Sequence, residues 1–551
     1  MICGNFNDTI GYSVFSFPFF PYLTTVFLSS MNREENISQL QNTSKIWDIA
    51  VIGGGSSGLG VALDAISRGL SVILFEKSDF AKGTSSRSTK LVHGGVRYLA
   101  QGDVGLVFEA LKERGKLLQN APHLAHDQPF IIPIFTAKDR IMYSVGLKIY
   151  DWMSGRLSLG KSEFISKEET LKRLPGLKSE GLYGGVVYHD GQFDDARLAL
   201  NLAQSADEAG TCVLNYVSVN NLVKNEAGKI TGLQVSDKLS RKKYEVNAKM
   251  VVNATGVFAD KILQMDNPEA PKMIQPSQGI HLVLDLDFLG GKDALMIPKT
   301  RDGRVLFAVP WHGKLVVGTT DTLREKPKLE PEALQKEIDF VLETAAGYLA
   351  RNPTRADVKS VFAGLRPLAR PKEGSTKTKE ISRSHKVILS ESGLVTLTGG
   401  KWTTFRKMGE DTVEYFTKVT GEKLKDSKSL DMKIHGATSR VPDGHWGIYG
   451  FDAQPIQDLT KENKEWGAKL HPDFPNIEAE VIWAVREEMA MKVEDALARR
   501  IRMLFLDAQA AIDTAPKVAE LMAKEMGKDE KWIESELAEF TKTASKYLIK
   551  K

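Results

Sequence analysis

Cysteine is almost absent from this chain of 551 residues, which contains only Cys3 and Cys212. Two cysteines so far apart exclude a disulfide framework, and neither lies in a spacing that binds zinc or forms a pair of redox-active thiols. We therefore expect no metal site and a reducing compartment. Any redox chemistry would depend on a bound cofactor rather than on sulfur.

An excess of one charge is lacking as well, since 74 lysines and arginines stand against 70 aspartates and glutamates, a formal net charge of +4. So small an excess gives no electrostatic case for nucleic acid, and we expect none as a partner. Internal repeats and low-complexity tracts are not visible either. A chain of this length is expected to form two or three globular domains.

Charge is missing altogether from residues 9–32, a stretch that is rich in aromatic side chains. No lysine or arginine precedes it, as a secretory signal would require, and Pro18 and Pro21 would interrupt a membrane-spanning helix. We interpret residues 1–45 as a disordered extension, with Met31 as the true start. A weak membrane segment and a targeting segment are the alternatives.

An orderly pattern begins at residues 49–52 (IAVI), a short apolar run that is typical of a parallel strand covered on both faces. The run ends at a cluster of glycines. Residues 62–68 then predict a helix, and residues 71–75 predict a second buried strand that ends at Glu76. A strand–helix–strand unit of about thirty residues is typical of a dinucleotide-binding fold.

The glycines of this unit fit the pattern G-x-G-x-x-G at Gly53, Gly55 and Gly58. Gly53 allows the tight turn, Gly55 lets the backbone approach a pyrophosphate, and Gly58 lets the helix pack closely on the strand. Glu76 would accept hydrogen bonds from ribose hydroxyls. This fingerprint predicts a bound dinucleotide without separating FAD from NAD, and a glycine-rich turn with no ligand is the remaining alternative.

The rest of the chain predicts two further regions. Residues 277–284 and 304–317 predict antiparallel strands of a second layer. Beyond about residue 430, apolar residues recur at helical spacing, from Val481 to Ile501 and again from Trp532 to Phe540. The predicted domains are the extension at 1–45, a dinucleotide-binding domain at 46–430 with a substrate domain interleaved at about 126–190 and 265–360, and a helical domain at 431–551.

Small hydroxyl residues and glycines form one dense run at residues 84–99, TSSRSTKLVHGGVRYL. With this run the sequence resembles the FAD-dependent glycerol-3-phosphate dehydrogenases, whose pattern contains the string T-S-S-x-S-x-K-L-x-H-G-G-x-R-Y-L. Further strings of that family follow in order: DDARL at 194–198, VNATG at 252–256, VGTTD at 317–321, GLRPL at 364–368 and TGGKWTTFRK at 398–407. The resemblance extends from about residue 46 into the C-terminal helices.

The resemblance implies an α/β FAD-binding fold, Rossmann-like and of the glutathione-reductase/D-amino-acid-oxidase type, with an α+β substrate domain and a C-terminal helical domain. It also favours FAD over NAD. The small residues Ala254 and Gly256 would let the backbone lie against the dinucleotide, and a helix that begins near Thr403 would stabilise the negative charge of reduced flavin. The expected cofactor-binding residues are Gly53, Gly55, Gly58, Glu76, Thr84, Ser85, Ser86, Ser88, Lys90, Ala254, Gly256, Gly399, Gly400 and Thr403.

The implied reaction is the oxidation of sn-glycerol 3-phosphate to dihydroxyacetone phosphate by hydride transfer to FAD. A phosphorylated polyol needs cations to hold its phosphate, and arginine forks match phosphate oxygens. Arg366 lies between apolar residues of a predicted core strand, where its charge requires a partner. The expected substrate-binding residues are Arg97, Tyr98, Arg383 and Lys401, with Arg366 as a catalytic residue.

The proton of the substrate hydroxyl needs an acceptor. His281, on the predicted strand at 277–284, is the first candidate and His93 the second; a histidine on an apolar strand is otherwise a satisfied core residue. Alternatively, Arg366 polarises the alcohol oxygen and water takes the proton.

The resemblance implies a quinone as electron acceptor, a peripheral location on the inner face of the cytoplasmic membrane, and possible homodimerisation. Arg499, Arg500 and Arg502 on a predicted amphipathic helix would face an anionic membrane, or form a solvated helix face. The alternative functions are a glycerol-3-phosphate oxidase that uses oxygen, an amine or amino-acid oxidase of the same fold, and a flavin-binding protein without turnover.

Overall fold

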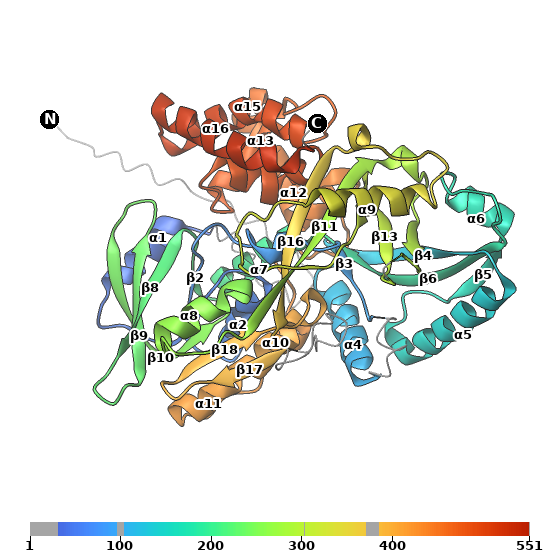
Figure 1. Cartoon of the computed structure of the whole chain (residues 1–551). Helices are drawn as coiled ribbons and strands as arrows, with labels where there is room; N and C mark the ends of the chain where they lie inside the picture. The colour runs from blue at the N-terminus through green and yellow to red at the C-terminus, as the bar shows by residue number, and fades with distance from the viewer. Residues whose placement is uncertain (1–30, 96–103, 302, 371–384, 550–551) are drawn as a thin grey trace, which may run out of the picture.

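The computed structural model describes residues 31–95, 104–301, 303–370 and 385–549. An α/β part at the left of Figure 1 joins a second sheet that extends to the right, and the C-terminal helices lie above them. The architecture agrees with the fold class expected from the sequence.

The first sheet carries the dinucleotide-binding unit. Its strand order is β17-β18-β10-β1-β2-β7, and β1 pairs in parallel with both β2 and β10. The strands are β1 (Ile46–Ile52), β2 (Val72–Phe75), β7 (Cys212–Leu214), β8 (Val217–Lys224), β9 (Ile230–Asp237), β10 (Lys243–Asn253), β17 (Lys386–Leu389) and β18 (Leu394–Thr398). The associated helices are α2 (Ser56–Ser67), α7 (Asp195–Glu208), α8 (Ala259–Asp266), α10 (Phe405–Val413) and α11 (Tyr415–Thr420).

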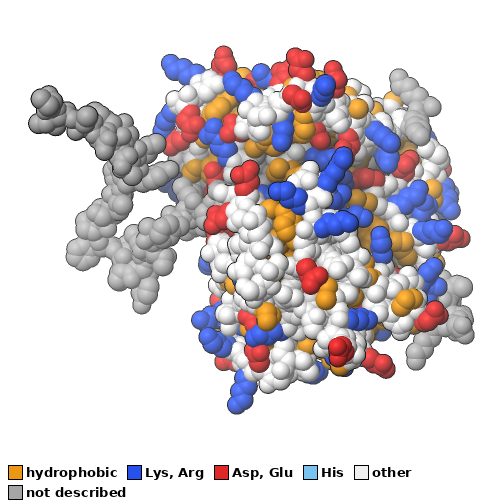
Figure 2. All heavy atoms as spheres, turned by 90° about the vertical axis from the view of Figure 1, so that its left-hand side faces the viewer, with side chains coloured by type: hydrophobic (Ala, Val, Ile, Leu, Met, Phe, Trp, Pro, Cys, Tyr) orange, Lys and Arg blue, Asp and Glu red, His pale blue; other side chains and the backbone are white. Residues whose placement is uncertain are grey.

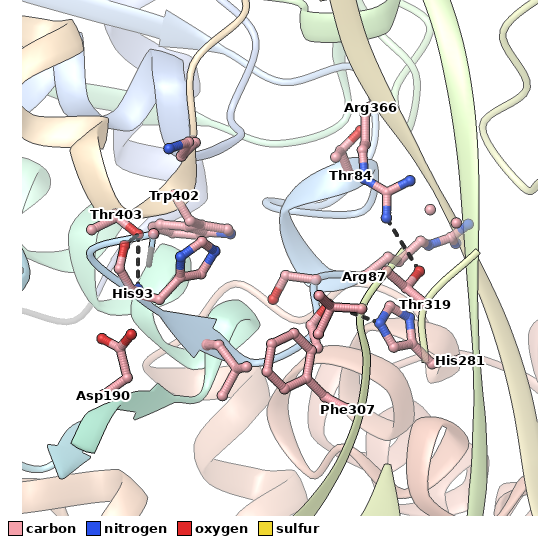
Figure 3. A pocket seen from close by; sticks show the side chains of 18 of the residues that line it. Thr84, Arg87, His93, Asp190, His281, Phe307, Thr319, Arg366, Trp402 and Thr403 are labelled. Atoms are coloured by element: carbon pink, nitrogen blue, oxygen red, sulfur yellow. Dashed lines mark hydrogen bonds between the residues drawn. The ribbon is translucent and has the colours of Figure 1, made fainter. Parts of the chain in front are cut away.

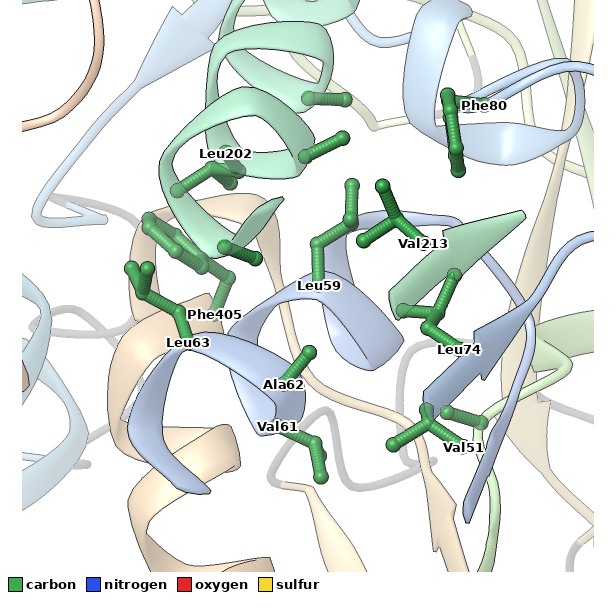
Figure 4. Packing of buried hydrophobic residues seen from close by; sticks show 14 of the residues in the cluster. Val51, Leu59, Val61, Ala62, Leu63, Leu74, Phe80, Leu202, Val213 and Phe405 are labelled. Carbon is green, nitrogen blue, oxygen red and sulfur yellow. The ribbon is translucent and has the colours of Figure 1, made fainter. Parts of the chain in front are cut away.

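Successive side chains of β1 point to opposite faces of this sheet, and both faces are covered. Val51 belongs to a core in which Leu59 of α2 and Phe405 of α10 also pack (Figure 4). Ala50 and Ile52 belong to a separate core, which includes residues of β8, β9 and α8. Burial on both faces explains why residues 49–52 are uniformly apolar.

The second sheet has the order β15-β11-β14-β13-β12-β4-β6-β3, with β16 paired to β11 and β5 paired to β6. Its strands are β3 (Leu91–Val92), β4 (Ala125–Ile134), β5 (Glu163–Ser166), β6 (Gly184–Phe193), β11 (Ile274–Asp285), β12 (Ala294–Ile297), β13 (Leu306–Trp311), β14 (Lys314–Gly318), β15 (Thr322–Leu323) and β16 (Ser360–Ala369). Its helices are α4 (Val104–Asn120), α5 (Ala137–Ser154), α6 (Lys167–Arg173) and α9 (Gln335–Ala346). The two segments expected to form the interleaved substrate domain therefore build most of this sheet.

The C-terminal helices pack on the second sheet. They are η10 (Gly444–Asp452), α12 (Ala453–Glu462), α13 (Glu478–Arg486), α14 (Met503–Leu506), α15 (Ala508–Met526) and α16 (Glu530–Ala544), followed by the short turn η13 (Ser545–Tyr547). Their shared core contains Val283, Trp311 and Phe362 from the sheet. The helical part expected beyond residue 430 therefore shares a core with the second sheet.

The apolar periodicity beyond residue 481 is interrupted. Met489 has φ of +50°, and a π-helical turn at Asp495–Arg500 follows. The Asp495 carboxylate accepts hydrogen bonds from the backbone N–H groups of Met491 and Lys492, at 2.9 and 3.0 Å. These side-chain bonds to the backbone favour a turn over a continued helix.

The prediction of a disordered extension at residues 1–45 is wrong in part, because residues 31–45 are ordered in this structure. Helix α1 (Arg33–Ser38) begins at Asn32, whose side chain accepts hydrogen bonds from the backbone N–H groups of the first helical turn. Arg33 pairs with Asp237 at 2.6 Å, and Leu40 is buried against the first sheet. Residues 1–30 lie outside the described part of the chain.

The three C-terminal arginines require a second correction, because they face neither solvent nor membrane. Arg499, Arg500 and Arg502 are all at most 3% exposed. Arg499 and Arg500 both bind the Asp79 carboxylate, and Arg502 donates to Asp195 at 2.8 Å. Buried guanidinium groups require such partners, which the sequence pattern alone did not reveal.

The described residues contain neither a helix that could span a membrane nor a cluster of metal-binding side chains. None of their helices is both long and apolar enough to cross a bilayer, and no grouping of histidine, cysteine, aspartate and glutamate there is arranged to hold a metal ion. On the face shown in Figure 2, basic and acidic side chains are interspersed. This distribution agrees with the small net charge.

A buried histidine connects helix α7 to the C-terminal part and makes stability depend on pH. His435 contacts Glu208 at 2.5 Å through Nδ1 and Asp452 at 2.7 Å through Nε2. Burial opposes its positive charge, but hydrogen bonds to Asp452 and Glu208 raise the pKa of His435 to about 9. Because this pKa lies above the unfolded value, the charged ring contributes about 3 kcal/mol below pH 6.5.

We expect this contribution to be lost as pH rises from about 6.5 through about 9. Melting temperatures of the protein and of His435→Gln between pH 6 and pH 10 test the prediction. The variant should be less stable at the low end, and the difference should shrink as pH rises. A difference that stays constant across this range would contradict the assignment.

Candidate active site

A groove of about 170 Å³ lies at the carboxyl end of β1, where the glycine pattern begins. Gly53 has φ of +114°, and Gly54 donates a backbone hydrogen bond to Glu76 at 2.8 Å. A Cβ on Gly58 would lie 1.8 Å from the carbonyl oxygen of Gly53, so only glycine permits α2 to begin so close to the strand. The N-terminus of α2 lies at the groove, which Ser56 and Ser57 line.

Most of the expected cofactor residues line this groove. They are Gly53, Gly55, Glu76, Thr84, Ser85, Ala254, Gly256, Gly399 and Gly400. Ser88 and Thr403 instead line an adjoining cavity. Segments that lie far apart in the sequence, from Gly53 to Gly400, thus line one groove.

Ser86 and Lys90 do not border either space. Lys90 is fully buried, and its ammonium group donates to both oxygens of Asp195 at 2.8 Å and to the backbone carbonyl of Ser86 at 2.7 Å. Burial, opposed by Asp195 and assisted by Arg502, lowers the pKa of Lys90 to about 8. Lys90 is therefore part of the protein interior behind the two spaces, whereas the sequence had predicted a contact with the cofactor.

The adjoining cavity, of about 330 Å³, shares Thr84, Pro367, Gly400, Lys401 and Trp402 with the groove, so the two spaces lie side by side. Figure 3 shows Arg366, Thr319 and His281 along one side, and His93, Trp402 and Thr403 along the other. The first side and His93 come from the second sheet, since His93 follows β3, whereas Trp402 and Thr403 follow β18 of the first sheet. A molecule in this cavity would lie between the two domains.

Arg366 projects from β16 as expected for an arginine on a core strand. Its guanidinium group donates to the Thr320 carbonyl at 3.1 Å and to Thr319 Oγ1 at 3.2 Å, and it lies 3.8 Å from Asp321. A Cβ on Gly279 would lie 2.4 Å from the guanidinium nitrogen, so the neighbouring strand β11 leaves room for it. The arginine is thus held in one position at the wall of the cavity.

His281 lies on β11 and is 2% exposed. Its ring stacks on Phe362 with 4.9 Å between centroids, and its Nε2 is hydrogen-bonded to Thr89 Oγ1 at 2.9 Å. Burial, together with the positive charges of Lys90 and Arg366, lowers the pKa of His281 well below its usual value. The imidazole is therefore neutral at physiological pH and able to accept a proton.

The other expected substrate residues divide into two groups. Lys401 lines both spaces, and His93 is half-buried at the cavity, where its backbone N–H donates to Thr403 Oγ1 at 3.2 Å. Arg97, Tyr98 and Arg383 lie outside the described residues.

Several cavity residues were missed at the level of sequence. Arg87 and Trp402 lie within strings of the resembled family. Their membership of those strings could therefore have identified them as cavity residues. The aromatic residues Phe130, Tyr188 and Phe307 lie on core strands and offered no signal, because an apolar residue on a strand predicts only burial.

Comparison with known proteins identifies the family. A family model described as FAD dependent oxidoreductase matches residues 48–406, and one described as the C-terminal domain of alpha-glycerophosphate oxidase matches residues 395–533. Mitochondrial glycerol-3-phosphate dehydrogenases from Bos taurus and Homo sapiens are each 38% identical, over 94% of this chain and 75% of their own length. A probable one from Caenorhabditis elegans is 40% identical, over 89% of this chain and 72% of its own.

Solved structures agree with these matches. The glycerol-3-phosphate dehydrogenase from Bacillus halodurans complexed with FAD superposes with a TM-score of 0.77 at 28% identity, covering 95% of this chain and 99% of that one. The L-alpha-glycerophosphate oxidase from Mycoplasma pneumoniae shares the fold, with a TM-score of 0.54 at 18% identity over 70% of this chain and 98% of that one. The chain therefore belongs to the FAD-dependent oxidoreductases and, within them, to the glycerol-3-phosphate dehydrogenases.

Proposed function

We propose that this protein oxidises sn-glycerol 3-phosphate to dihydroxyacetone phosphate and passes the electrons to a quinone. The observation that carries the proposal is that the glycine-lined groove shares part of its wall with a cavity lined by His281, Arg366 and Lys401. A flavin bound in the groove would have a base and cations at one end, where an alcohol substrate would supply the hydride.

The groove fits FAD on several independent features. The N-terminus of α2 suits the pyrophosphate, and both oxygens of Glu76 accept backbone N–H bonds, from Gly54 and Ser78 at 2.8 Å, which orients the carboxylate for a ribose. The left-handed backbone of Gly256 has nothing within 4 Å of the place where a Cβ would be, so the cofactor can lie against it. When bound, FAD supplies the hydride acceptor.

The cavity suits a phosphorylated alcohol better than an amino acid. Arg366 and Lys401 both line it, and Gly95, which also lines it, precedes the expected substrate residue Arg97 by two positions. Several cations match a dianionic phosphate, whereas an amino-acid oxidase requires one arginine for a carboxylate. We propose that Arg366, Lys401, Arg97 and Arg383 hold the phosphate or the alcohol oxygen, with Tyr98 beside them.

Bleaching of the yellow flavin tests the substrate. Under nitrogen, glycerol 3-phosphate should reduce the bound flavin of the purified protein, whereas glycerol, which lacks the phosphate, and amino acids should leave it oxidised. Absorbance of the oxidised flavin measures the result. Reduction by an amino acid instead would support the oxidase alternative, and no reduction by any of them would support a flavin-binding protein without turnover.

His281→Asn should lower the rate of anaerobic flavin reduction by about a hundredfold or more, as expected for the loss of a general base. Stopped-flow absorbance at saturating glycerol 3-phosphate gives the rate. The variant should keep its flavin, because His281 lines the cavity and not the groove. An unchanged rate would remove His281 from the mechanism and favour water as proton acceptor.

A peripheral membrane contact is supported by an exposed apolar stripe on α5. Ile141, Val145, Ile149 and Trp152 follow one another at helical spacing and are 67%, 55%, 46% and 78% exposed. Lys138, Arg140 and Lys148 of the same helix are exposed and basic, a combination that suits an anionic bilayer surface. Tyr150 on the buried side of α5 donates to Asp190, a cavity residue, at 2.9 Å, which places the stripe near the site.

A protein bound to a membrane through this surface would have a membrane-bound quinone as its electron acceptor.

The relatives from Bos taurus and Homo sapiens are mitochondrial by name, which favours a mitochondrial membrane over the cytoplasmic membrane expected from the sequence. Faster reoxidation of the reduced flavin by a short-chain quinone than by oxygen would support a dehydrogenase. A homodimer stays a prediction, which sedimentation of the flavin-bound protein measures.

Replacing the stripe should release the protein from lipid. Val145→Glu and Trp152→Glu should each weaken binding to vesicles of phosphatidylcholine and phosphatidylglycerol by about tenfold, because a carboxylate opposes both insertion and charge attraction. Leu239→Glu is the matched control, since Leu239 is exposed after β9 at the opposite end of the molecule from α5 (Figure 1). Equal binding of all variants in a vesicle flotation assay would contradict the role of α5.

A further inference from the structure

Thr89 and His281 both line the cavity, and their side chains are hydrogen-bonded to each other. Thr89 is half-buried, whereas His281 is 2% exposed and presents Nε2 to Thr89 Oγ1 at 2.9 Å. Within the described part of the chain, no hydrogen-bond partner is found for Nδ1 of His281, which is buried. Nε2 is therefore the ring nitrogen that has a hydroxyl partner at the cavity, and it accepts a hydrogen bond from Thr89 when the ring hydrogen is on Nδ1.

The imidazole cannot easily turn away from this hydroxyl. Its ring stacks on Phe362 at an interplanar angle of 20°. On the neighbouring strand β14, a Cβ on Gly318 would lie 2.4 Å from Cδ2 of the ring, so the backbone of that strand packs directly against the imidazole. The ring is confined between these contacts, and its distance to Thr89 is fixed by packing as well as by the hydrogen bond.

The backbone on either side of Thr89 is anchored by a single carboxylate. Ser88 donates to Asp195 through its backbone N–H at 3.0 Å and its hydroxyl at 2.7 Å, and Lys90 donates to the same carboxylate. Asp195 is fully buried in the first turn of α7, where the helix N-terminus stabilises its charge. Both neighbours of Thr89 are thus tied to one rigid helix, which holds the hydroxyl at the cavity wall.

We propose that the Thr89 hydroxyl transfers the proton of the substrate alcohol to Nε2 of His281. The substrate O–H bond breaks as an O–H bond forms at Thr89, and the original Thr89 proton moves to Nε2. When bound, FAD would accept the hydride from the substrate C–H bond, and the substrate carbon would then form a carbonyl with the deprotonated oxygen. This inference rests on the proposed function, and it assigns Thr89 a catalytic role that a purely structural threonine would not have.

The electrostatics of the site favour coupling these two transfers. Lys90 and Arg366 both oppose a positive imidazole ring. The substrate phosphate and the electrons that arrive with the hydride add negative charge to the same region, so the ring gains its proton most easily when the hydride leaves. A threonine hydroxyl suits this step because it accepts one proton while giving up another and carries no net charge afterwards.

Three variants test the relay, with the rate of anaerobic flavin reduction and the dissociation constant of glycerol 3-phosphate measured for each. Thr89→Val keeps the shape and removes the hydroxyl, and it should slow reduction by about a hundredfold with little change in substrate affinity. Thr89→Ser should restore the rate to within about threefold of the unaltered protein. Thr344→Val is the matched control, because it removes a threonine hydroxyl that bonds only within α9.

The double variant Thr89→Val with His281→Asn separates a relay from two independent effects. If the proton passes through both groups, the rate of the double variant should lie within about threefold of the rate of the slower single variant. Multiplying losses, or a Thr89→Val rate within threefold of the unaltered protein, would overturn the proposal. A Thr89→Val protein that purifies without flavin would assign the hydroxyl to cofactor retention and would also overturn it.

Failure of the relay can be distinguished from failure of the proposed function. If glycerol 3-phosphate does not bleach the unaltered protein, the proposed function fails. If it does, and Thr89→Val responds equally fast, only the relay fails.

Discussion

The architecture depends on a set of buried ion pairs between the cofactor domain and the C-terminal part. Asp79, which follows β2, binds Arg499 and Arg500, and Asp195, which opens α7, binds Arg502. Removing one member of such a pair leaves an uncompensated charge in the interior, which typically costs about 3–5 kcal/mol. The C-terminal helices are therefore bound to the cofactor domain by charge and to the substrate domain by a shared apolar core.

The Asp195 carboxylate also connects these buried ion pairs to the wall of the cavity. Asp195 accepts hydrogen bonds from Arg502 of the C-terminal part and from Ser88 and Lys90 beside the cavity. The position of the cavity wall is thereby set by a residue that contacts neither cofactor groove nor cavity. A satisfied network of this kind resists small displacements, which suits a site where a hydride must travel a short and well-defined distance.

The sequence predicted those features that depend on neighbours along the chain. The strand–glycine–helix unit at Gly53 to Glu76 is local, so periodicity and turn chemistry were sufficient, and Arg366 was visible as a charge inside an apolar strand. Partners that lie far apart were not predictable. Lys90 finds Asp195 105 residues later, and Arg500 finds Asp79 421 residues earlier. Without those partners, Lys90 suggested a ligand contact and the arginines suggested a membrane face.

One contact of the cavity bears on how the protein is made. Arg87, which lines the cavity, donates to the hydroxyl group of Tyr547 in the turn η13, 460 residues later in the chain, and to Glu330 at 2.6 Å. During synthesis, the groove gains the last of its described lining residues at Met408, well before the end of the chain. The wall at Arg87 gains its last partner only after 460 further residues have been translated, so a nascent chain can acquire a nucleotide-binding shape well before its catalytic cavity is complete.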